Sequence, residues 1–226
     1  MDNYSVFDIL GPIMIGPSSS HTAGAAKIGK LARKISGNDF DSVLFYLHGS
    51  FAKTYKGHGT DRALVAGILG MEPYDERLRG SLKIANKKGI KVKFVETDLG
   101  YRHPNTVKIV FYKKGKKQDE IIGSSIGGGN VIITNINGYK VEFTGDYPTL
   151  ITRQYDRPGI ISKVTAIFAT NNINIGKMKV NRKGKGQEAS MVIETDSEIP
   201  NEAIKKILQI NEIISARAIN LRKKEV

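Results

Sequence analysis

The sequence predicts an α+β protein built from two domains. Its 226 residues are enough for two ordinary domains that each bury a hydrophobic core. In residues 1–145, segments with the apolar periodicity of helices are mixed with segments that have the alternation of strands. Residues 148–226 instead show a self-contained series of predicted strands and helices. We place the boundary near Gly145 to Pro148, because the new pattern begins there.

The first domain begins with two expected helices. Residues 4–10 carry apolar side chains ahead of Gly11 and Pro12, a pair that stops a helix. From Thr22 onward, small and apolar residues recur at the spacing of a helix that packs closely on a neighbour, and Gly37 ends it. The residues on the packed face are Ala25, Ile28, Leu31, Ala32 and Ile35.

A buried strand and two more helices are expected next. Residues 43–47 are a β-branched and aromatic run, which predicts a buried strand that leads into a loop at residues 48–61. Thr60 or Asp61 is expected to cap a helix through Leu69. The next helix is expected at residues 75–88, with basic residues in its last turn.

The rest of the first domain predicts strands. They are expected at residues 91–96, 106–112, 131–134 and 139–143. The last two are joined by a turn at residues 135–138. The glycine-rich segment at residues 123–130 lies between the expected strands, and its three consecutive glycines let the backbone adopt positive φ or approach another surface closely.

The second domain follows the order βαββαβ. Strands are expected at residues 149–154, 173–180, 189–194 and 213–219, and helices at residues 160–170 and 200–210. The first of these helices is amphipathic. Its expected buried residues are Ile160, Ile161, Val164, Ile167 and Phe168.

The composition excludes several classes of site. The chain has no Cys, which removes disulfides, zinc-thiolate sites and Cys-ligated clusters from what it can build alone. Its net charge of +13 is shared by both predicted domains, and no basic patch is interleaved with aromatic residues, so no nucleic-acid partner is expected. Without a long apolar stretch or a basic signal region, the chain is expected to be cytoplasmic, with no membrane partner.

The segment GPSSSHT, residues 16–22, places hydroxyls and an imidazole immediately before a helix. Free N–H groups and the positive end of the helix dipole attract an anion there, and a carboxylate would fit. His21 is a candidate for moving a proton near neutral pH. A simple helix cap with a surface histidine is the alternative. The candidate substrate-binding hydroxyls are those of Ser18, Ser19, Ser20 and Thr22.

A second group of functional residue types lies in residues 48–61, after the predicted strand, where α/β folds usually build sites. His58, between two glycines, favours a functional role, whereas His48 is nearly as well explained as a strand-end residue. No H-x-x-x-H or H-x-H spacing supports a histidine metal site. The remaining candidates for substrate binding are His48, Ser50, Thr60, Asp61 and Asn105.

The second domain closely resembles an ACT domain. The resemblance rests on the βαββαβ order, on DRPGII at residues 156–161 and on NINI at residues 172–175. It implies a ferredoxin-like fold, side-by-side dimerisation and a small effector, often an amino acid, near the first loop and helix. A purely dimer-forming role is the alternative, with Pro and Gly only shaping the turn. The candidate effector-binding residues are Asp156, Pro158, Gly159, Ile160 and Asn174.

The motifs of the whole chain resemble the beta chain of iron-sulfur-dependent L-serine dehydratase, the two-chain bacterial type. They are SVFDILGPIMIGPSSSHTAGAAKIG, LHGSFAKTYKGHGTDRALVAGILG, HPNTVKI and SIGGGN, followed by the ACT-like domain. The resemblance implies a first domain similar to the allosteric substrate-binding domain of certain phosphoglycerate dehydrogenases. It also implies a partner alpha chain that ligates a 4Fe-4S cluster, so no metal ligand is expected in this chain.

The reaction that this resemblance implies is that of an L-serine ammonia-lyase, which converts L-serine to pyruvate and ammonia in amino-acid catabolism and gluconeogenesis. The cluster would help hydroxide to depart while a nearby base takes the Cα proton. His21 and His58 are the candidates for that base or for the residue that orients it, and the sequence does not distinguish them. The alternative is a non-catalytic amino-acid-sensing regulator whose loops form only a ligand pocket.

Overall fold

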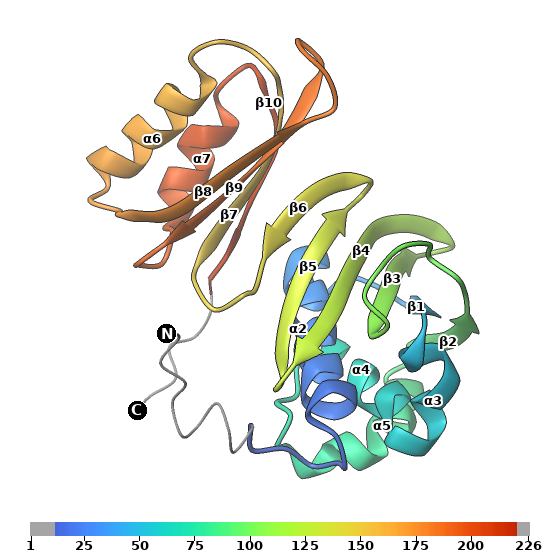
Figure 1. Ribbon diagram of the computed structural model, residues 1–226. Coiled ribbons are helices and arrows are strands. Elements are labelled where there is room, and N and C mark those ends of the chain that lie inside the picture. The colour runs from blue at the N-terminus through green and yellow to red at the C-terminus, as the bar shows by residue number, and fades with distance from the viewer. Residues whose placement is uncertain (1–11, 221–226) are drawn as a thin grey trace, which may run out of the picture. The chain divides into compact units, whose positions relative to one another are not determined.

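The structure, a computed structural model, describes residues 12–220. Contacts divide the chain into two compact units, residues 1–137 and 138–226 (Figure 1). Both units mix helices and strands, which is the α+β class that the sequence predicts. The helix expected at residues 4–10 lies outside the described residues. No helix within residues 12–220 combines the length and the apolar character needed to cross a bilayer.

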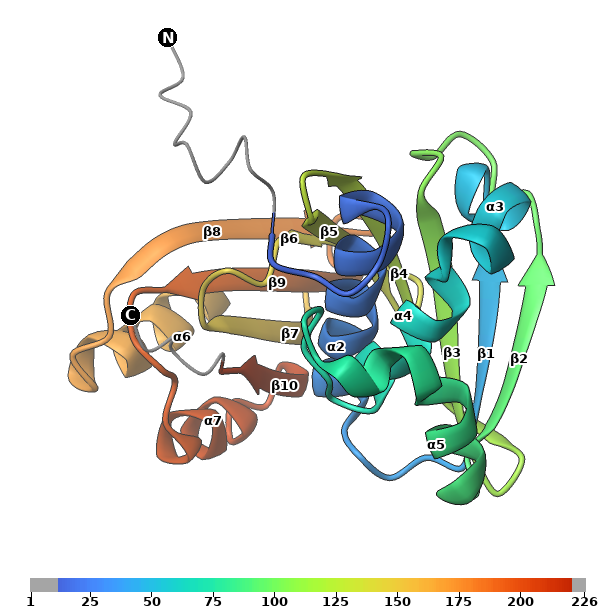
Figure 2. The same cartoon turned by 90° about the horizontal axis from the view of Figure 1, so that it is seen from below.

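A sheet with helices on one face makes up the first unit (Figures 1 and 2). The strands are β1 (Ser42–Leu47), β2 (Lys91–Glu96), β3 (Thr106–Lys113), β4 (Lys116–Gly127) and β5 (Asn130–Ile136), in the order β2-β1-β3-β4-β5. β1 and β2 are parallel, and β1, β3, β4 and β5 pair antiparallel. A parallel pair needs a long crossover, and the helices between β1 and β2 supply it.

The helices of the first unit are α2 (Ala25–Ser36), α3 (Ser50–His58), α4 (Thr60–Ile68) and α5 (Ser81–Lys87). A π-helical turn, η1 (Ser19–Gly24), precedes α2, and a 3-10 turn, η2 (Glu76–Gly80), precedes α5. The predicted packed face of α2 is confirmed, since all five of its residues are buried. The helix expected at residues 75–88 is present in two pieces, η2 and α5.

Residues 48–61 do not form the predicted loop. Gly49 and Gly59 have φ values of 60° and 70°, and α3 runs between them. Gly59 caps both the end of α3 and the start of α4, without a side-chain hydrogen bond, so neither Thr60 nor Asp61 is the cap. A left-handed glycine ends one helix and lets the next begin at once, which is why two helices replace the loop.

The sequence pattern does not predict β4, a strand of 12 residues. Its first half is highly charged and its second half is rich in Gly and Ser, so the alternation typical of strands is weak. The strand forms because β3 and β5 pair with it on both sides. Part of the glycine-rich segment expected between strands, residues 123–127, therefore lies in the sheet.

The second unit contains the predicted βαββαβ order after one further strand. Its elements are β6 (Tyr139–Phe143), β7 (Thr149–Tyr155), α6 (Ile160–Thr170), β8 (Ile175–Arg182), β9 (Glu188–Thr195), α7 (Asn201–Leu208) and β10 (Ile213–Ile219). The sheet has the order β10-β7-β9-β8, with antiparallel neighbours throughout. The expected boundary near residues 145–148 would place β6 in the first domain, whereas the observed division places it in the second unit.

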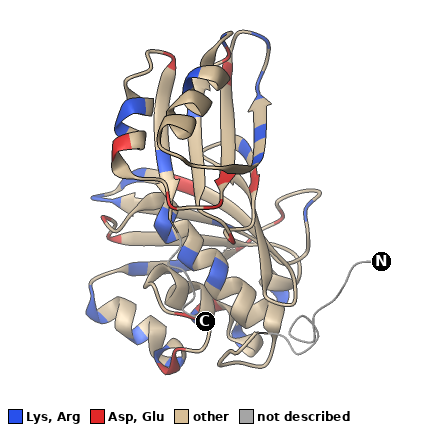
Figure 3. Cartoon of the chain, turned by 90° about the vertical axis from the view of Figure 1, so that its left-hand side faces the viewer, with Lys and Arg blue, Asp and Glu red and all other residues tan. Residues whose placement is uncertain are grey.

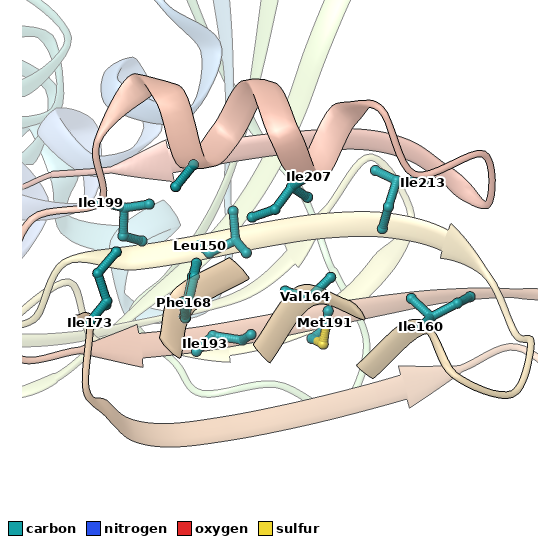
Figure 4. Packing of buried hydrophobic residues seen from close by; sticks show 11 residues of the cluster. Leu150, Ile160, Val164, Phe168, Ile173, Met191, Ile193, Ile199, Ile207 and Ile213 are labelled. Atoms are coloured by element: carbon teal, nitrogen blue, oxygen red, sulfur yellow. The ribbon is translucent and has the colours of Figure 1, made fainter. Parts of the chain in front are cut away.

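The two helices of the second unit bury an apolar core against its sheet (Figure 4). Ile160, Val164 and Phe168 of α6 are buried there with Leu150 of β7. The prediction that Ile161 belongs to this core is wrong, since that side chain is 44% exposed. One residue corresponds to about 100° of helix rotation, so the neighbour of Ile160 points away from the sheet.

Lys and Arg side chains are spread over both units and do not form one basic patch in the view of Figure 3. Figure 3 shows Lys and Arg on helices and strands of both units, interspersed with Asp and Glu. Several of them are neutralised locally, for example by the ion pair of Lys113 with Asp39 and that of Lys163 with Glu212. The net charge of +13 therefore belongs to a mixed surface.

Candidate active site

His21 lies at the centre of a hydrogen-bonded cluster just before α2. Its Nε2 is 3.1 Å from Ser50 Oγ, and its Nδ1 is 3.4 Å from Ser18 Oγ. Ser18 is also the N-cap of η1, where the backbone N–H of His21 donates to its Oγ at 3.2 Å. The two segments that the sequence marks as functional, residues 16–22 and 48–61, therefore meet at His21.

His58 completes an imidazole pair. The ring centroids of His21 and His58 are 4.9 Å apart with an interplanar angle of 35°. His58 Nδ1 lies 3.4 Å from the carbonyl oxygen of Thr54. Because a carbonyl oxygen can only accept, this contact favours the tautomer with the proton on Nδ1, which leaves Nε2 of neutral His58 with a lone pair.

Burial lowers the pKa of His21 from its ordinary value of 6.5, and the neighbouring His58 lowers it further. A hydrogen bond with the backbone of Ser50 acts in the opposite direction. His21 is therefore neutral at pH 7, and it stays neutral to a lower pH than an exposed imidazole does.

Replacing His58 with Gln is expected to raise the pKa of His21, because the repulsion between two imidazolium rings disappears. The pKa should stay below 6.5, since burial is the larger cause of its depression. An NMR titration that follows the ring Cε1–H signal of His21 measures this. Lys53→Gln, an exposed change on the same helix, should move the midpoint little. An unchanged midpoint in His58→Gln would contradict the coupling of the two rings.

Several hydroxyls near this cluster are more deeply buried than the sequence indicates. Thr22 and Thr60 are 1% and 0% exposed, and neither Oγ1 has a hydrogen-bond partner among the described residues. The same holds within residues 12–220 for Asn105 Oδ1 and Ser125 Oγ. Buried polar atoms are normally paired, so these atoms call for a water, a ligand or a partner group.

Ser125 is a residue of this region that sequence reasoning missed. Its N–H donates to the carbonyl oxygen of Asn105 at 2.9 Å. Its side chain packs against Gly24, so closely that a Cβ at Gly24 would clash with it. Asn105 follows Pro104, whose carbonyl oxygen accepts the N–H of Ser50 at 2.9 Å. The available signal is the polar pair before the glycines of SSIGGG, which by itself indicates only a loop.

The other predicted substrate-binding residues differ in how close they lie to His21. Ser19 and Ser20 lie half-buried in η1 beside His21. His48 instead accepts the N–H of Leu99 at 3.1 Å through Nδ1, so this hydrogen bond does not involve His21 or His58. Asp61 Oδ1 accepts the N–H of Arg62 at 2.8 Å, and burial raises the pKa of this carboxyl group.

A cavity of about 280 Å³ adjoins His58. Gly16 and Thr22 line one side of it, and the turn between α3 and α4 lines another. No Asp or Glu is among the described residues that line it. Its basic wall residues are Lys56, Arg62 and Arg79.

The predicted effector residues of the second unit gather mostly at the start of α6. Gly159, with φ of 87°, is the N-cap of α6, next to Pro158 and the buried Ile160. Asp156 Oδ2 accepts the N–H of Gly186 at 3.1 Å. These residues are therefore brought together by the turn between β7 and α6.

Asn174 is not part of that group within one chain. It precedes β8, and its Nδ2 donates to Asp196 Oδ2 at 2.6 Å. Asp156 lies 3.4 Å from Arg182, the last residue of β8. The length of β8 therefore separates Asn174 from Asp156.

Comparisons with known proteins match both units. A family model described as the serine dehydratase beta chain matches residues 5–79, and one described as the ACT domain matches residues 149–212. Together with the fold, these matches define the class: a two-unit α+β protein with an ACT domain in its second unit.

Similarity to single proteins is more specific. The L-serine dehydratase beta chain of Peptoniphilus asaccharolyticus is 42% identical over 222 residues, which covers 98% of this chain and 100% of that protein. The probable L-serine dehydratase beta chain of Bacillus subtilis (strain 168) is 43% identical over 95% of this chain and 97% of that protein. The chain belongs to the L-serine dehydratase beta-chain family.

A more distant similarity concerns another enzyme. The D-3-phosphoglycerate dehydrogenase of Methanocaldococcus jannaschii is 29% identical over 202 residues, which covers 87% of this chain but 37% of that protein. Most of this chain is therefore similar in sequence to part of a longer protein.

The residues of this chain do not fit an iron-sulfur cluster. Such clusters are held mainly by Cys thiolates, and the sequence has no Cys. Within residues 12–220, no group of three or more His, Asp or Glu side chains is placed to hold a metal ion.

Proposed function

We propose that this chain is the beta subunit of an L-serine ammonia-lyase and supplies the base that removes the Cα proton of L-serine. The single observation that carries this proposal is the imidazole pair, with ring centroids 4.9 Å apart. Loss of the proton and of the hydroxyl group gives aminoacrylate, which tautomerises to an imine. Hydrolysis of the imine gives pyruvate and ammonia.

The geometry supports His58 as the base. Its side chain is exposed and lines the cavity, and its contact with Thr54 leaves Nε2 as the acceptor. A general base needs an accessible lone pair within reach of the proton that it removes. Nε2 of His58 has that accessibility.

His21 is better suited to position His58 and the substrate. Both of its ring nitrogens face Ser hydroxyls, those of Ser18 and Ser50, and its ring is partly buried against Phe51. A neutral His21 places no positive charge beside the proposed His58 base. Ser19, Ser20 and Asn105, close to this cluster, are proposed to orient the substrate.

We further propose the partners that the family resemblance implies. In that resemblance an alpha chain carries the Cys ligands and the 4Fe-4S cluster, and the absence of Cys from this chain agrees with that division. The proposed domains are residues 1–145 and 148–226, and the second domain mediates dimerisation and binds an effector. The proposed location is the cytoplasm.

The test is anaerobic co-purification of this chain with the alpha chain, followed by measurement of pyruvate formed from L-serine. We expect activity only when both chains are present. An alpha chain that is fully active alone would overturn the proposal. Binding of L-serine by this chain, without any effect on the activity of the alpha chain, would instead favour the amino-acid-sensing regulator.

A further inference from the structure

The cavity beside His58 has an unusual concentration of positive charge. Lys56, Arg62 and Arg79 line it, and they come from the end of α3, the start of α4 and η2. Within residues 12–220, no carboxylate forms an ion pair with any of these three side chains. Asp61 lies nearby: its Oδ1 accepts the N–H of Arg62, and its carboxyl group interacts electrostatically with Arg62 and Lys56, which leaves Arg79 and a net positive charge around the cavity. The cavity is therefore built to receive an anion.

Backbone and hydroxyl donors add to this charge. Gly59, in the cavity wall, is the N-cap of the 9-residue helix α4 and offers no side chain to its first turn, where Asp61 Oδ1 accepts the N–H of Arg62. Thr22, also in the wall, is 1% exposed and its Oγ1 has no partner among the described residues. A Cβ at Gly16 would lie 2.6 Å from Thr22 Cγ2, so only Gly leaves room for this threonine.

We propose that this cavity is the subsite that binds the carboxylate of L-serine, with Lys56, Arg62 and Arg79 as its ligands. The inference rests on the proposed function for its substrate. Arg guanidinium groups match the two oxygens of a carboxylate, and Lys adds a third charged donor. At about 280 Å³ the cavity suits a small metabolite rather than a large ligand.

The same charges fix the orientation of the substrate. L-serine carries an ammonium group as well as a carboxylate, and three cations repel the ammonium group from the cavity. The carboxylate enters and the ammonium group points outward. Because His58 is part of the cavity wall, the Cα atom bonded to the carboxylate then lies beside the proposed base.

Steady-state kinetics of the assembled two-chain enzyme test this subsite. Arg62→Gln and Arg79→Gln are each expected to raise KM for L-serine about tenfold and to change kcat less than about threefold, because ground-state binding is lost. Arg77→Gln is the matched control, since Arg77 is also in η2 but its Nε donates to Asp75 at 2.9 Å. Wild-type KM in both Arg62→Gln and Arg79→Gln would overturn the subsite.

Direct binding to the full chain alone separates this inference from the proposed function. The probes are L-serine, L-serinamide, which lacks the carboxylate, and inorganic phosphate, at constant ionic strength. We expect saturable NMR shifts of the Gly57 and Gly59 amides with L-serine, weakened by Arg62→Gln and absent with L-serinamide. If phosphate gives saturable shifts of these amides and L-serine does not, the carboxylate subsite is overturned. Arg62-dependent binding of L-serine by a chain whose complex forms no pyruvate would sustain the subsite and refute the proposed function.

Discussion

Replacing His58 with Gln is expected to lower kcat of the assembled enzyme by about 10²- to 10⁴-fold, the usual contribution of a general base. Gln keeps the size and polarity of the side chain but cannot take a proton at neutral pH. The contact of His58 with Thr54 is on the surface of α3, so the fold should persist. Pyruvate formation from saturating L-serine measures the effect.

Two comparisons identify the loss as a loss of proton transfer. Lys53→Gln, on the same helix and exposed, should retain wild-type turnover. In His58→Ala, added imidazole should restore part of kcat, because the site is open to solvent. His21→Gln is expected to reduce turnover less and to preserve the pH dependence set by His58. Near-wild-type turnover in both His58→Gln and His21→Gln would exclude the imidazole pair from the chemistry.

The sequence predicts the second unit more completely than the first. Each of its six expected elements is present, because its strands alternate and its first helix has strong apolar periodicity. The exception is the exposure of Ile161, which follows Ile160 directly. An apolar doublet on a helix does not reveal which of its members faces the core.

In the first unit, tertiary context overrides local pattern. The sequence predicts a loop where α3 forms, because the segment is polar and bounded by Gly49 and Gly59, and only Phe51 is buried along its length. The start of this helix is held from outside, since the carbonyl oxygen of Pro104 accepts the N–H of Ser50. β4 likewise depends on pairing with its two neighbours.

The candidate site is only partly predictable for the same reason. Residue type singles out His21 and His58, and the two segments that carry them do meet in the structure. Lys56, Arg62 and Arg79 look like ordinary surface charges in the sequence, and only the fold gathers them around one cavity. Thr22 and Thr60 look like accessible donors, but the packing of α2 and α4 buries both.

Replacing Gly67 with Ala is expected to destabilise the first unit by about 3 kcal/mol or more, at the upper end of what overpacking does. Gly67 of α4 faces Gly29 of α2, where the helix backbones touch. A Cβ at Gly67 would lie 2.7 Å from the backbone nitrogen of Lys30 and 2.8 Å from Cα of Gly29, and closer still to the carbonyl oxygen of Ala26. Backbone atoms cannot rotate away as a side chain can, so the helices must separate.

Urea unfolding followed by far-UV circular dichroism measures this loss, and Gly80→Ala is the matched control. Gly80 has φ of −102°, and a Cβ added there would meet no neighbouring atom within 4 Å, so its replacement should change stability by less than about 1 kcal/mol. Equal unfolding midpoints for the two variants would contradict the close helix contact. The same contact bears on function, because η1, which carries His21, leads into α2, and α4 begins two residues after His58. Folded Gly67→Ala protein should therefore also show a weaker coupling between the two imidazole rings.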